Sequence, residues 1–266
     1  MKYRLIAADM DGTLLTDDKR ITDRTADAVR RAGEAGVFFC LSTGRPLGGV
    51  RRYIEQLGLT TPAITYNGAV IVDPVTGAFI YEQGLEPEAA KEIWQLGMEF
   101  DTTIIVWSKE RLLVNRIDDR VEKYKLISGV EPVIIDGVDC LAADGITKML
   151  WYDEIDRING LQDILPSRLT CPANFATSNP RFLEFFDHRV SKAAAMERLG
   201  EYLGVSREEM IAIGDGWNDL PMLRYAGLGV AMANAPDEIR AQCGHVTASN
   251  EEDGVALAIE KLILNG

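Results

Sequence analysis

The sequence predicts an α/β fold in which a doubly wound, mostly parallel sheet carries an inserted α+β domain. At both ends of the chain, short apolar runs alternate with helix-like stretches, which is the pattern of parallel strands covered by helices. Several of these runs end directly in acidic residues, glycine or threonine, as strands do where a parallel sheet presents a ligand site. The middle third mixes hairpin and helix patterns, and a chain of 266 residues is long enough for two domains.

The N-terminal part contains three apolar runs of strand length separated by two helices. Residues 37–41 are continuously apolar, which is typical of a strand covered on both faces. Thr22 can cap the helix that precedes this strand, and Pro46 suits the first turn of the helix that follows it. The expected elements are strands at 3–8, 37–41 and 63–66 and helices at 23–35 and 46–57.

The middle part begins with a hairpin and continues as an α+β pattern. Residues 70–72 and 79–81 are apolar and flank a turn that contains Pro74 and Gly77, which predicts two paired strands. Further expected elements are strands at 103–107, 112–115, 132–135, 147–152 and 182–186 and helices at 87–100, 119–128 and 154–165. We expect residues 84–180 to form the inserted domain, and residues 1–83 and 181–266 to form the sheet domain.

The alternating pattern resumes in the C-terminal part. Ser191 can cap a helix that runs to residue 203, and Gly204 is placed to end it. The elements expected after it are strands at 210–213 and 228–232 and helices at 217–225, 236–243 and 253–264. The two ends of the chain are therefore predicted to build one sheet.

Composition limits the classes of function. The formal net charge of −13, with no basic block, argues against nucleic acid and against anionic membrane surfaces as partners. No apolar stretch reaches the roughly 18 residues that span a membrane, and the first apolar run is too short for a signal peptide. Four scattered cysteines form no C-x-x-C pair, so we expect buried, reduced thiols. We therefore expect a cytoplasmic, globular protein.

Asp9 and Asp11 form the first part of a predicted site. They directly follow the first apolar run, and alternate residues of an extended chain point to the same side. Two carboxylates this close repel each other unless a cation or a shared proton relieves them, and Mg²⁺ prefers carboxylate oxygens together with water and phosphate. Taken alone, the two residues could also be ordinary solvated turn residues.

Three further strand ends carry polar groups, and all such ends lie at one edge of a parallel sheet. Lys192, at the start of a helix, is expected near the same edge. Taken singly, Thr43 could be only a turn hydroxyl, and Lys192 could be a solvated surface lysine. The groups expected to meet the two acids are Thr43 with Gly44, Asn67 with Gly68, and Asp215 with Asn218 and Asp219.

Phosphoryl transfer through a covalent intermediate would use this set of residues. Asp9 would attack phosphorus, and Asp11 would protonate the leaving alcohol and then deprotonate the attacking water. Mg²⁺, Lys192 and backbone N–H groups would supply the positive charge that an anion attacking an anion requires. The remaining groups divide into phosphate contacts (Thr43 and Asn218) and a metal site (Asp215 beside Asp219).

Four stretches of the chain resemble, in order, the four motifs of the haloacid dehalogenase (HAD) superfamily. These are Asp9-Met10-Asp11-Gly12-Thr13, Thr43 within Ser42-Thr43-Gly44-Arg45, Lys192, and Gly214-Asp215-Gly216-Trp217-Asn218-Asp219. The Thr-Gly-Arg form, the strand end at 66–69 and residues 229–235 are similar to the Cof-type branch, and particularly to YidA-like sugar phosphatases. The resemblance implies a Rossmann-like core with a large α+β cap (C2, type IIB) inserted between the second and third motifs.

The resemblance also implies a site and an activity. The implied activity is Mg²⁺-dependent hydrolysis of small phosphorylated metabolites, with sugar phosphates as the expected class. The implied residues are Asp9 and Asp11 for catalysis; Met10 (through its main chain), Thr43, Gly44, Lys192 and Asn218 for phosphate; and Asp9, Asp11, Asp215, Gly216 and Asp219 for the metal.

Two other functions are compatible with these residues. A phosphomutase or phosphotransferase would use the same aspartyl-phosphate with an acceptor hydroxyl in place of water. A receiver-like signalling switch also combines acids, a threonine and a lysine on a doubly wound sheet, although Asp11 would discharge its phosphoryl group quickly.

Several other side chains have two interpretations. Arg45 could contact substrate or be solvated, and His188 is expected to be structural because Asp11 already supplies a base. Trp217 is expected to pack in the core, since tryptophan is readily buried. Four further aromatic residues could stack on a sugar but are more readily explained by core packing: Trp107, Trp151, Tyr152 and Phe175.

Overall fold

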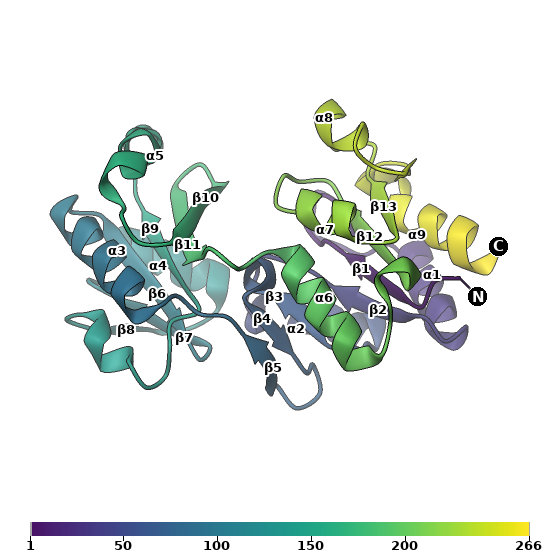
Figure 1. Cartoon of the computed structure of the whole chain (residues 1–266), viewed down its shortest axis with the longest axis horizontal. Helices are drawn as coiled ribbons and strands as arrows, with labels where there is room; N and C mark the ends of the chain where they lie inside the picture. Colours follow the sequence, from purple (N-terminus) through teal and green to yellow (C-terminus); the bar gives the residue numbers. More distant parts are fainter. Residues whose placement is uncertain (1, 266) are drawn as a thin grey trace. The chain divides into compact units, whose positions relative to one another are not determined.

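The computed structural model describes residues 2–265, apart from the side chain of Ser178, and the chain divides into two compact units (Figure 1). The first unit comprises Met1–Tyr81 and Ser191–Gly266, and the second comprises Glu82–Val190. Each unit contains a sheet and helices of its own (Figure 1).

Within the described residues, a five-stranded parallel sheet in the order β14-β13-β12-β1-β2 forms the centre of the first unit. Its strands are β1 (Leu5–Ala8), β2 (Phe38–Leu41), β12 (Met210–Gly214), β13 (Leu228–Ala231) and β14 (His245–Val246). The central strand β1 pairs with β12 and β2, so that Ala8 is level with Ile213 and Leu41. This register brings the residues that follow β1, β2 and β12 to one edge of the sheet.

Both faces of this sheet are covered. Leu5 and Ala7 pack in one cluster with residues of α6 and α7, while Ile6 and Ala8 point to the opposite face and are also buried. The helices of this unit are α1 (Asp23–Glu34), α2 (Leu47–Leu57), α6 (Lys192–Leu203), α7 (Leu220–Tyr225), α8 (Asp237–Arg240) and α9 (Gly254–Ile259). Three short 3₁₀ segments, η1 (Tyr66–Gly68), η3 (Arg207–Glu209) and η4 (Asn250–Glu252), and the π-helical segment η5 (Glu260–Leu264) complete it.

The two predicted N-cap residues, Thr22 and Ser191, cap their helices as expected. The Thr22 side chain accepts a hydrogen bond from the Thr25 N–H at the start of α1, and the Ser191 side chain accepts one from the Ala194 N–H at the start of α6. These caps satisfy N–H groups that have no partner inside a helix. At the other end of α6, Gly204 adopts a positive φ of 63° and ends the helix.

The third predicted strand differs from expectation. β3 (Ala63–Thr65) pairs antiparallel with β4 (Val70–Val72) in a three-stranded sheet completed by β5 (Phe79–Glu82). It meets the parallel sheet at an isolated parallel bridge between Ser42 and Ile64. The strand end at Asn67 nevertheless stays close to β2, because the Asn67 N–H donates to the Thr43 carbonyl at 2.9 Å.

The second unit contains a six-stranded sheet, within the described residues, in the order β10-β11-β9-β6-β7-β8. Its core lies between one face of the sheet and two of the helices, where Val106 and Trp151 pack with Ile93 of α3 and Ile158 of α5. The elements are α3 (Pro87–Glu99), β6 (Thr103–Ser108), β7 (Arg111–Val114), α4 (Asp119–Ser128), β8 (Pro132–Ile134), η2 (Val138–Leu141), β9 (Lys148–Tyr152), α5 (Ile155–Arg168), β10 (Ala173–Asn179) and β11 (Phe182–Asp187).

The predicted boundary at residue 180 is wrong, and so is the burial predicted for one cysteine. β11 pairs with β9 and with the unpredicted strand β10, so residues 181–190 belong to the inserted α+β unit and not to the parallel-sheet unit. Cys140 is exposed, Cys171 and Cys243 are half-buried, and Cys40 is fully buried as predicted; all four are free thiols. The predicted fold class, a doubly wound sheet with an α+β insert, is confirmed.

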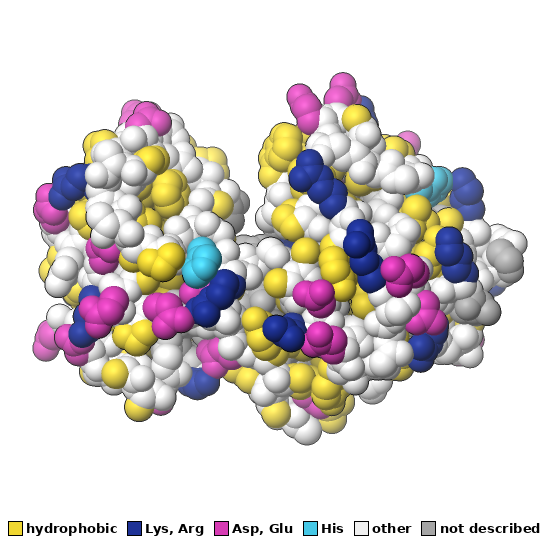
Figure 2. All heavy atoms as spheres, in the orientation of Figure 1, with side chains coloured by type: hydrophobic (Ala, Val, Ile, Leu, Met, Phe, Trp, Pro, Cys, Tyr) yellow, Lys and Arg dark blue, Asp and Glu magenta, His cyan; other side chains and the backbone are white. Residues whose placement is uncertain are grey.

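One face of the molecule shows mixed charge (Figure 2). On the face drawn in Figure 2, acidic and basic side chains are interspersed, and no extended basic patch is visible there. Among the described residues, every helix is too short or too polar to cross a bilayer.

Candidate active site

The candidate site lies at the carboxyl edge of the parallel sheet, where β1 and β12 end side by side. Asp9 follows β1, and Asp215 follows β12 directly. Lys192 is the first residue of α6, which packs beside α7. Residues separated by about 200 positions in the chain therefore meet because neighbouring parallel strands end at the same level.

Lys192 is the buried centre of this site. Its side chain is fully buried, and its Nζ lies 2.5 Å from Asp9 Oδ1 and 2.5 Å from Asp219 Oδ1. Burial by itself lowers the pKa of this lysine, but the charges of Asp219 and Asp9 outweigh burial and hold its pKa above the ordinary value. The ammonium group is therefore charged, and it partly neutralises the two carboxylates.

Three carboxylates surround this single ammonium group. One oxygen from each of Asp9, Asp215 and Asp219 lies within 4.8 Å of the others. Burial, helped by the charge of Asp219 and opposed by Lys192, raises the pKa of Asp9 to about 8. Burial also raises the pKa of Asp215 to about 6, although the Thr13 hydroxyl, which donates to it at 2.6 Å, acts in the opposite direction. The excess negative charge fits a bound divalent cation, which would favour the ionised carboxylates.

The three acids differ in how many of their carboxylate oxygens are already hydrogen-bonded. Asp219 Oδ1 contacts Lys192, and its Oδ2 accepts from the backbone N–H groups of Asp215 (3.0 Å) and Gly216 (2.8 Å). Both of its oxygens are thus used to hold the lysine and the loop. By contrast, the second oxygen of Asp9 and that of Asp215 make no hydrogen bond with the described residues. Asp9 and Asp215 are therefore the acids best placed to bind a cation directly.

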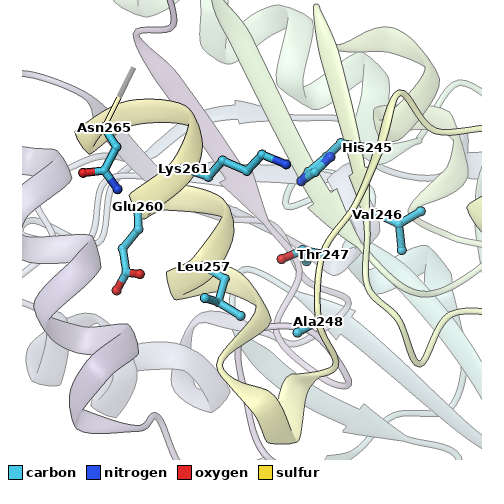
Figure 3. Close-up of a pocket in the computed structure, with 8 residues that line it drawn as sticks. All are labelled: His245, Val246, Thr247, Ala248, Leu257, Glu260, Lys261 and Asn265. Atoms are coloured by element: carbon cyan, nitrogen blue, oxygen red, sulfur yellow. The ribbon is translucent and has the colours of Figure 1, made fainter.

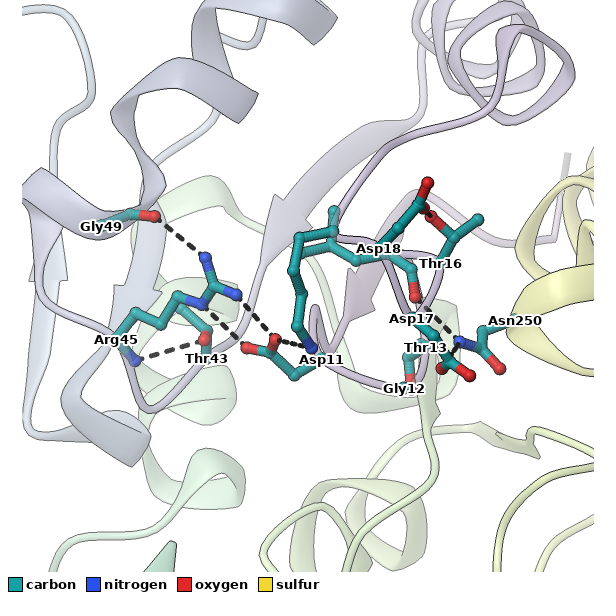
Figure 4. Close-up of polar contacts among 12 residues, drawn as sticks. Asp11, Gly12, Thr13, Thr16, Asp17, Asp18, Thr43, Arg45, Gly49 and Asn250 are labelled. Atoms are coloured by element: carbon teal, nitrogen blue, oxygen red, sulfur yellow. Dashed lines mark hydrogen bonds and ion pairs between the residues drawn. The ribbon is translucent and has the colours of Figure 1, made fainter. Parts of the chain in front are cut away.

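Asp11 is not part of this acidic cluster and is held instead by basic side chains (Figure 4). Its carboxylate accepts hydrogen bonds from Arg45 Nε (2.8 Å) and Nη2 (2.6 Å), and from Lys19 Nζ at 2.8 Å. Burial favours the neutral form, but these bonds and charges outweigh it and hold the pKa of Asp11 below its usual value. Asp11 is thus an ionised carboxylate clamped by two cations, and its side chain is placed beside the cluster and not inside it.

Glycine is required where the β1 loop passes Asp215. Gly12 has a φ of +84°, a conformation that other residues adopt only with strain. A Cβ at this position would also collide with the Asp215 carboxylate. Gly12 therefore allows both the positive φ and the close approach of the backbone to an acidic side chain.

The remaining predicted phosphate residues surround the same edge. Thr43 is buried, and its hydroxyl accepts from the Arg45 N–H at 3.2 Å (Figure 4). Asn218 Nδ2 donates to Asn67 Oδ1 at 3.2 Å, and a Cβ on Gly44 would lie 3.0 Å from the same Asn67 oxygen. Asn67, which was expected at this edge, therefore joins the second and fourth predicted motifs.

Met10 and Gly216 can contribute only main-chain atoms. The Met10 side chain is fully buried, and its carbonyl accepts from the Leu15 N–H at 2.8 Å. The Gly216 N–H is bonded to Asp219, as described above. Neither methionine nor glycine has a side-chain oxygen, so their predicted roles depend on backbone groups.

Two cationic contacts were missed or left open by the sequence. Arg45 was left between substrate contact and solvent, and it instead forms the two-point contact with Asp11. Lys19 was not singled out, because an isolated lysine in a turn carries no specific signal. Its side chain reaches Asp11 because the chain turns back after the acidic motif, with the Lys19 N–H donating to the Thr16 carbonyl at 2.9 Å.

Most of the aromatic residues singled out in the sequence, and His188, have structural positions. Trp107, Trp151 and Tyr152 are buried in the second unit, and Phe175 packs against its core. His188 Nδ1 lies 3.0 Å from the Pro172 carbonyl, which fits the structural role expected for it. Trp217 is 60% exposed, so its predicted core position is wrong. The reason is that Trp217 lies in the turn between Gly216 and Asp219, away from the helix that follows.

A hollow in the surface of the first unit lies between β14 and η5, away from the residues described above in the chain (Figure 3). Lys261 extends toward His245 there, and burial together with the charge of Lys261 lowers the pKa of the imidazole. The acid on this wall, Glu260, is paired with Arg24 at 2.8 Å. This hollow offers no pair of facing carboxylates, so the chemistry predicted from the sequence has its place at β1 and β12.

Comparison with known proteins identifies the family. The sequence pattern of the haloacid dehalogenase-like hydrolases matches residues 6–259, which include all the residues described at the β1 and β12 edge. The chain belongs to the haloacid dehalogenase-like hydrolase family. The family predicted from the four motifs is therefore confirmed.

Relatives of this haloacid dehalogenase-like hydrolase match along their whole length. YxeH of Bacillus subtilis, provisionally named a phosphatase, is 34% identical over 267 residues, covering 98% of this chain and 99% of YxeH. YitU of the same organism, named a 5-amino-6-(5-phospho-D-ribitylamino)uracil phosphatase, is 30% identical over 272 residues, or 96% of each chain. A haloacid dehalogenase-like hydrolase from Bacteroides thetaiotaomicron has a solved structure that is 30% identical, with a TM-score of 0.87, covering 98% of this chain and 100% of that one. The likeness extends through both units, and the chain is an enzyme of this hydrolase family.

Proposed function

We propose that this chain is a Mg²⁺-dependent phosphatase that hydrolyses small phosphorylated metabolites through an aspartyl-phosphate on Asp9. Sugar phosphates are the substrate class that we expect. The observation that carries the proposal is the position of Asp9. One of its oxygens contacts the buried ammonium of Lys192 at 2.5 Å, while the other makes no hydrogen bond with the described residues. A carboxylate held in this way has one oxygen fixed and one available for attack.

The first half of the reaction forms the covalent intermediate. The available Asp9 oxygen bonds to phosphorus as the bond between phosphorus and the leaving oxygen breaks, and a proton from Asp11 converts the leaving group to an alcohol. Asp11 is ionised and clamped by Arg45 and Lys19, so when the substrate binds those contacts must loosen and the carboxylate must first take up a proton from water.

The second half releases phosphate. Asp11 takes a proton from water, the water oxygen bonds to phosphorus, and the bond between Asp9 and phosphorus breaks to restore the carboxylate. The ionised state of Asp11 suits this step directly. A phosphomutase or phosphotransferase would differ only in that an acceptor hydroxyl replaces water.

The charge of the phosphoryl group must be balanced by the site. Lys192 holds one positive charge beside Asp9, while Thr43, Asn218 and the backbone of Met10 and Gly44 would contact the phosphoryl oxygens. A Mg²⁺ ion held by Asp9 and Asp215, with Asp219 as the neighbouring acid, would supply further positive charge to the phosphoryl oxygens when bound.

A panel of phosphate esters, assayed with and without Mg²⁺, tests the proposal. We expect turnover that depends on Mg²⁺ and is abolished in Asp9→Asn. Asp18→Asn is a matched control, because Asp18 is an exposed acid on the same loop and pairs with Arg20. Turnover that survives Asp9→Asn, or no turnover on any ester, would contradict the proposal. Phosphate transferred to an added alcohol in preference to water would favour the phosphotransferase.

A further inference from the structure

Trp217 lies at the tip of the loop that carries the acidic cluster. The loop connects the end of β12 to the start of α7, and Trp217 stands between Gly216 and Asn218. Its side chain is 60% exposed, whereas the other three tryptophans of the chain are buried in the second unit: Trp94, Trp107 and Trp151. An indole this exposed gains little of the free energy that burial of its large apolar surface would give, so stability of the fold does not explain it.

The backbone on either side of Trp217 is fixed. The Asp219 N–H donates to the Gly216 carbonyl at 3.0 Å, and Asp219 Oδ2 accepts from the Asp215 and Gly216 N–H groups. A Cβ on Gly216 would lie 2.5 Å from Asn218 Oδ1, so the turn is tight as well as hydrogen-bonded. Trp217 is therefore presented by a rigid turn.

The indole itself has no assigned partner. It makes no hydrogen bond, cation–π contact or ring contact with the residues that the structure describes. Its neighbours in the turn are residues proposed to hold the metal and the phosphoryl group, Asp215 and Asn218. Consecutive Cα atoms are about 3.8 Å apart, so the Trp217 backbone lies within two residue spacings of both Asp215 and Asn218, and its exposed indole starts at the edge of the proposed phosphoryl site.

We propose that the Trp217 indole contacts the leaving group and selects phosphate esters whose leaving group carries a ring. This inference rests on the proposed function, because it takes the phosphoryl group to be bound beside Asp9. A planar heterocycle and the apolar face of a sugar ring can both stack on an indole, whereas a short ringless alcohol offers no such surface. Trp217 is thus a specificity residue and takes no part in the proton or phosphoryl transfer.

Steady-state kinetics of Trp217→Ala and Trp217→Phe test the inference with three esters. They are uridine 5′-monophosphate, which carries a planar heterocycle, glucose 6-phosphate, which carries a sugar ring, and glycerol 3-phosphate, which has no ring. Stacking on an aromatic side chain is lost on truncation to alanine, so KM for the ring-bearing esters should rise about tenfold. We expect kcat to stay unchanged, Trp217→Phe to recover most of the loss, and glycerol 3-phosphate to show no change. The two ring-bearing esters show which kind of ring is preferred.

Tyr202→Ala is the matched control. Tyr202 is also an exposed aromatic residue, 59% exposed, but it lies near the end of α6 opposite to Lys192. Replacing Tyr202 with alanine should change neither KM nor kcat for any of the three esters. An equal loss on all three esters in Trp217→Ala would show that the indole only supports the loop, and an unchanged KM for both ring-bearing esters would show that it does not contact them. Either result would overturn the inference.

Tryptophan emission provides a readout that does not require turnover. In Asp9→Asn, titration with a ring-bearing ester should change the emission, because Trp217 is the exposed tryptophan and the other three are buried. The double variant Asp9→Asn/Trp217→Phe should not respond. If an ester is hydrolysed but leaves the emission unchanged, this inference fails and the proposed function stands. If no ester is turned over by the wild-type enzyme, both fail.

Discussion

Removal of the Lys192 ammonium tests the charge arrangement of the site. In Lys192→Met, the buried carboxylates of Asp9 and Asp219 lose the cation that lies 2.5 Å from each of them. Removing one partner of a buried ion pair typically costs about 3–5 kcal/mol, because the remaining charge is buried without compensation. We expect a loss of unfolding free energy in this range at pH 8 and a loss of about 10²–10³-fold in kcat, since an electrostatic donor is also removed.

The stability loss should depend on pH in a defined direction. The pKa of Asp9 is about 8 in the folded protein, above the ordinary aspartate pKa of 3.8, so the free energy of unfolding falls as pH rises between these two values. Without Lys192 the folded pKa of Asp9 rises further, and protonation relieves the repulsion at low pH. The pKa of Lys192 is itself raised on folding, so its stabilising contribution is fully present below its ordinary value and throughout pH 5–8. The cost of Lys192→Met should therefore be larger at pH 8 than at pH 5.

Urea unfolding followed by circular dichroism, in metal-free buffer at pH 5 and pH 8, measures this cost. Lys148→Met is a matched control, because Lys148 forms a buried ion pair with Glu184 at 2.6 Å in the second unit, far along the chain from the acidic cluster. The control should lose stability too, but without the loss in kcat expected for Lys192→Met. A Lys192→Met variant as stable as wild type at both pH values, or equally destabilised at both, would refute the reasoning.

Three further substitutions have definite expected outcomes. Gly12→Ala should lose stability by about 1–3 kcal/mol and weaken Mg²⁺ binding in calorimetry, whereas Gly36→Ala, which has the same φ of +84° but open space around the added Cβ, should lose stability alone. Ser42→Ala should leave stability unchanged or raise it by up to about 1 kcal/mol in a thermal melt, because the Ser42 hydroxyl is buried without a partner among the described residues; a large loss would show that this hydroxyl has a partner. Arg45→Ala should raise the pKa of Asp11 and so move the acid limb of the pH–rate profile to higher pH, because the ionised form of Asp11 loses its two-point contact; an unmoved limb would show that Asp11 is not the titrating base.

The location of the site could be predicted from the sequence because its residues follow strands. Asp9 and Asp215 each come directly after an apolar run, and parallel strands end at one edge whatever lies between them in the chain. The helix start at Ser191 then placed Lys192 near that edge. These predictions needed only strand ends and helix caps, which are local signals.

The orientation of individual side chains could not be predicted in the same way. Alternation along a strand predicts that Asp11 points to the same side as Asp9, yet Arg45 and Lys19 draw its carboxylate away from the cluster. The direction of the Asp11 carboxylate depends on charges that tertiary structure brings together, and no local sequence pattern predicts these contacts. Trp217 was assigned to the core from its residue type alone, but the tight turn around it leaves the indole exposed.

The boundary of the inserted unit was missed for a related reason. The alternation in β11 is compatible with either sheet, and only its pairing with β9 and β10 assigns it to the insert. β10 itself was not predicted, because residues 173–179 are mostly polar or small and lack an apolar run.

Borohydride trapping during turnover tests the bond between Asp9 and phosphorus most directly. Borohydride reduces an acyl phosphate to an alcohol, so an enzyme that passes through an aspartyl-phosphate should lose activity while substrate is present and show homoserine at residue 9 in its peptide mass spectrum. Enzyme treated without substrate should keep Asp9 intact. Continued turnover in borohydride with residue 9 unmodified, or a reduced residue at any other position, would contradict the proposed nucleophile.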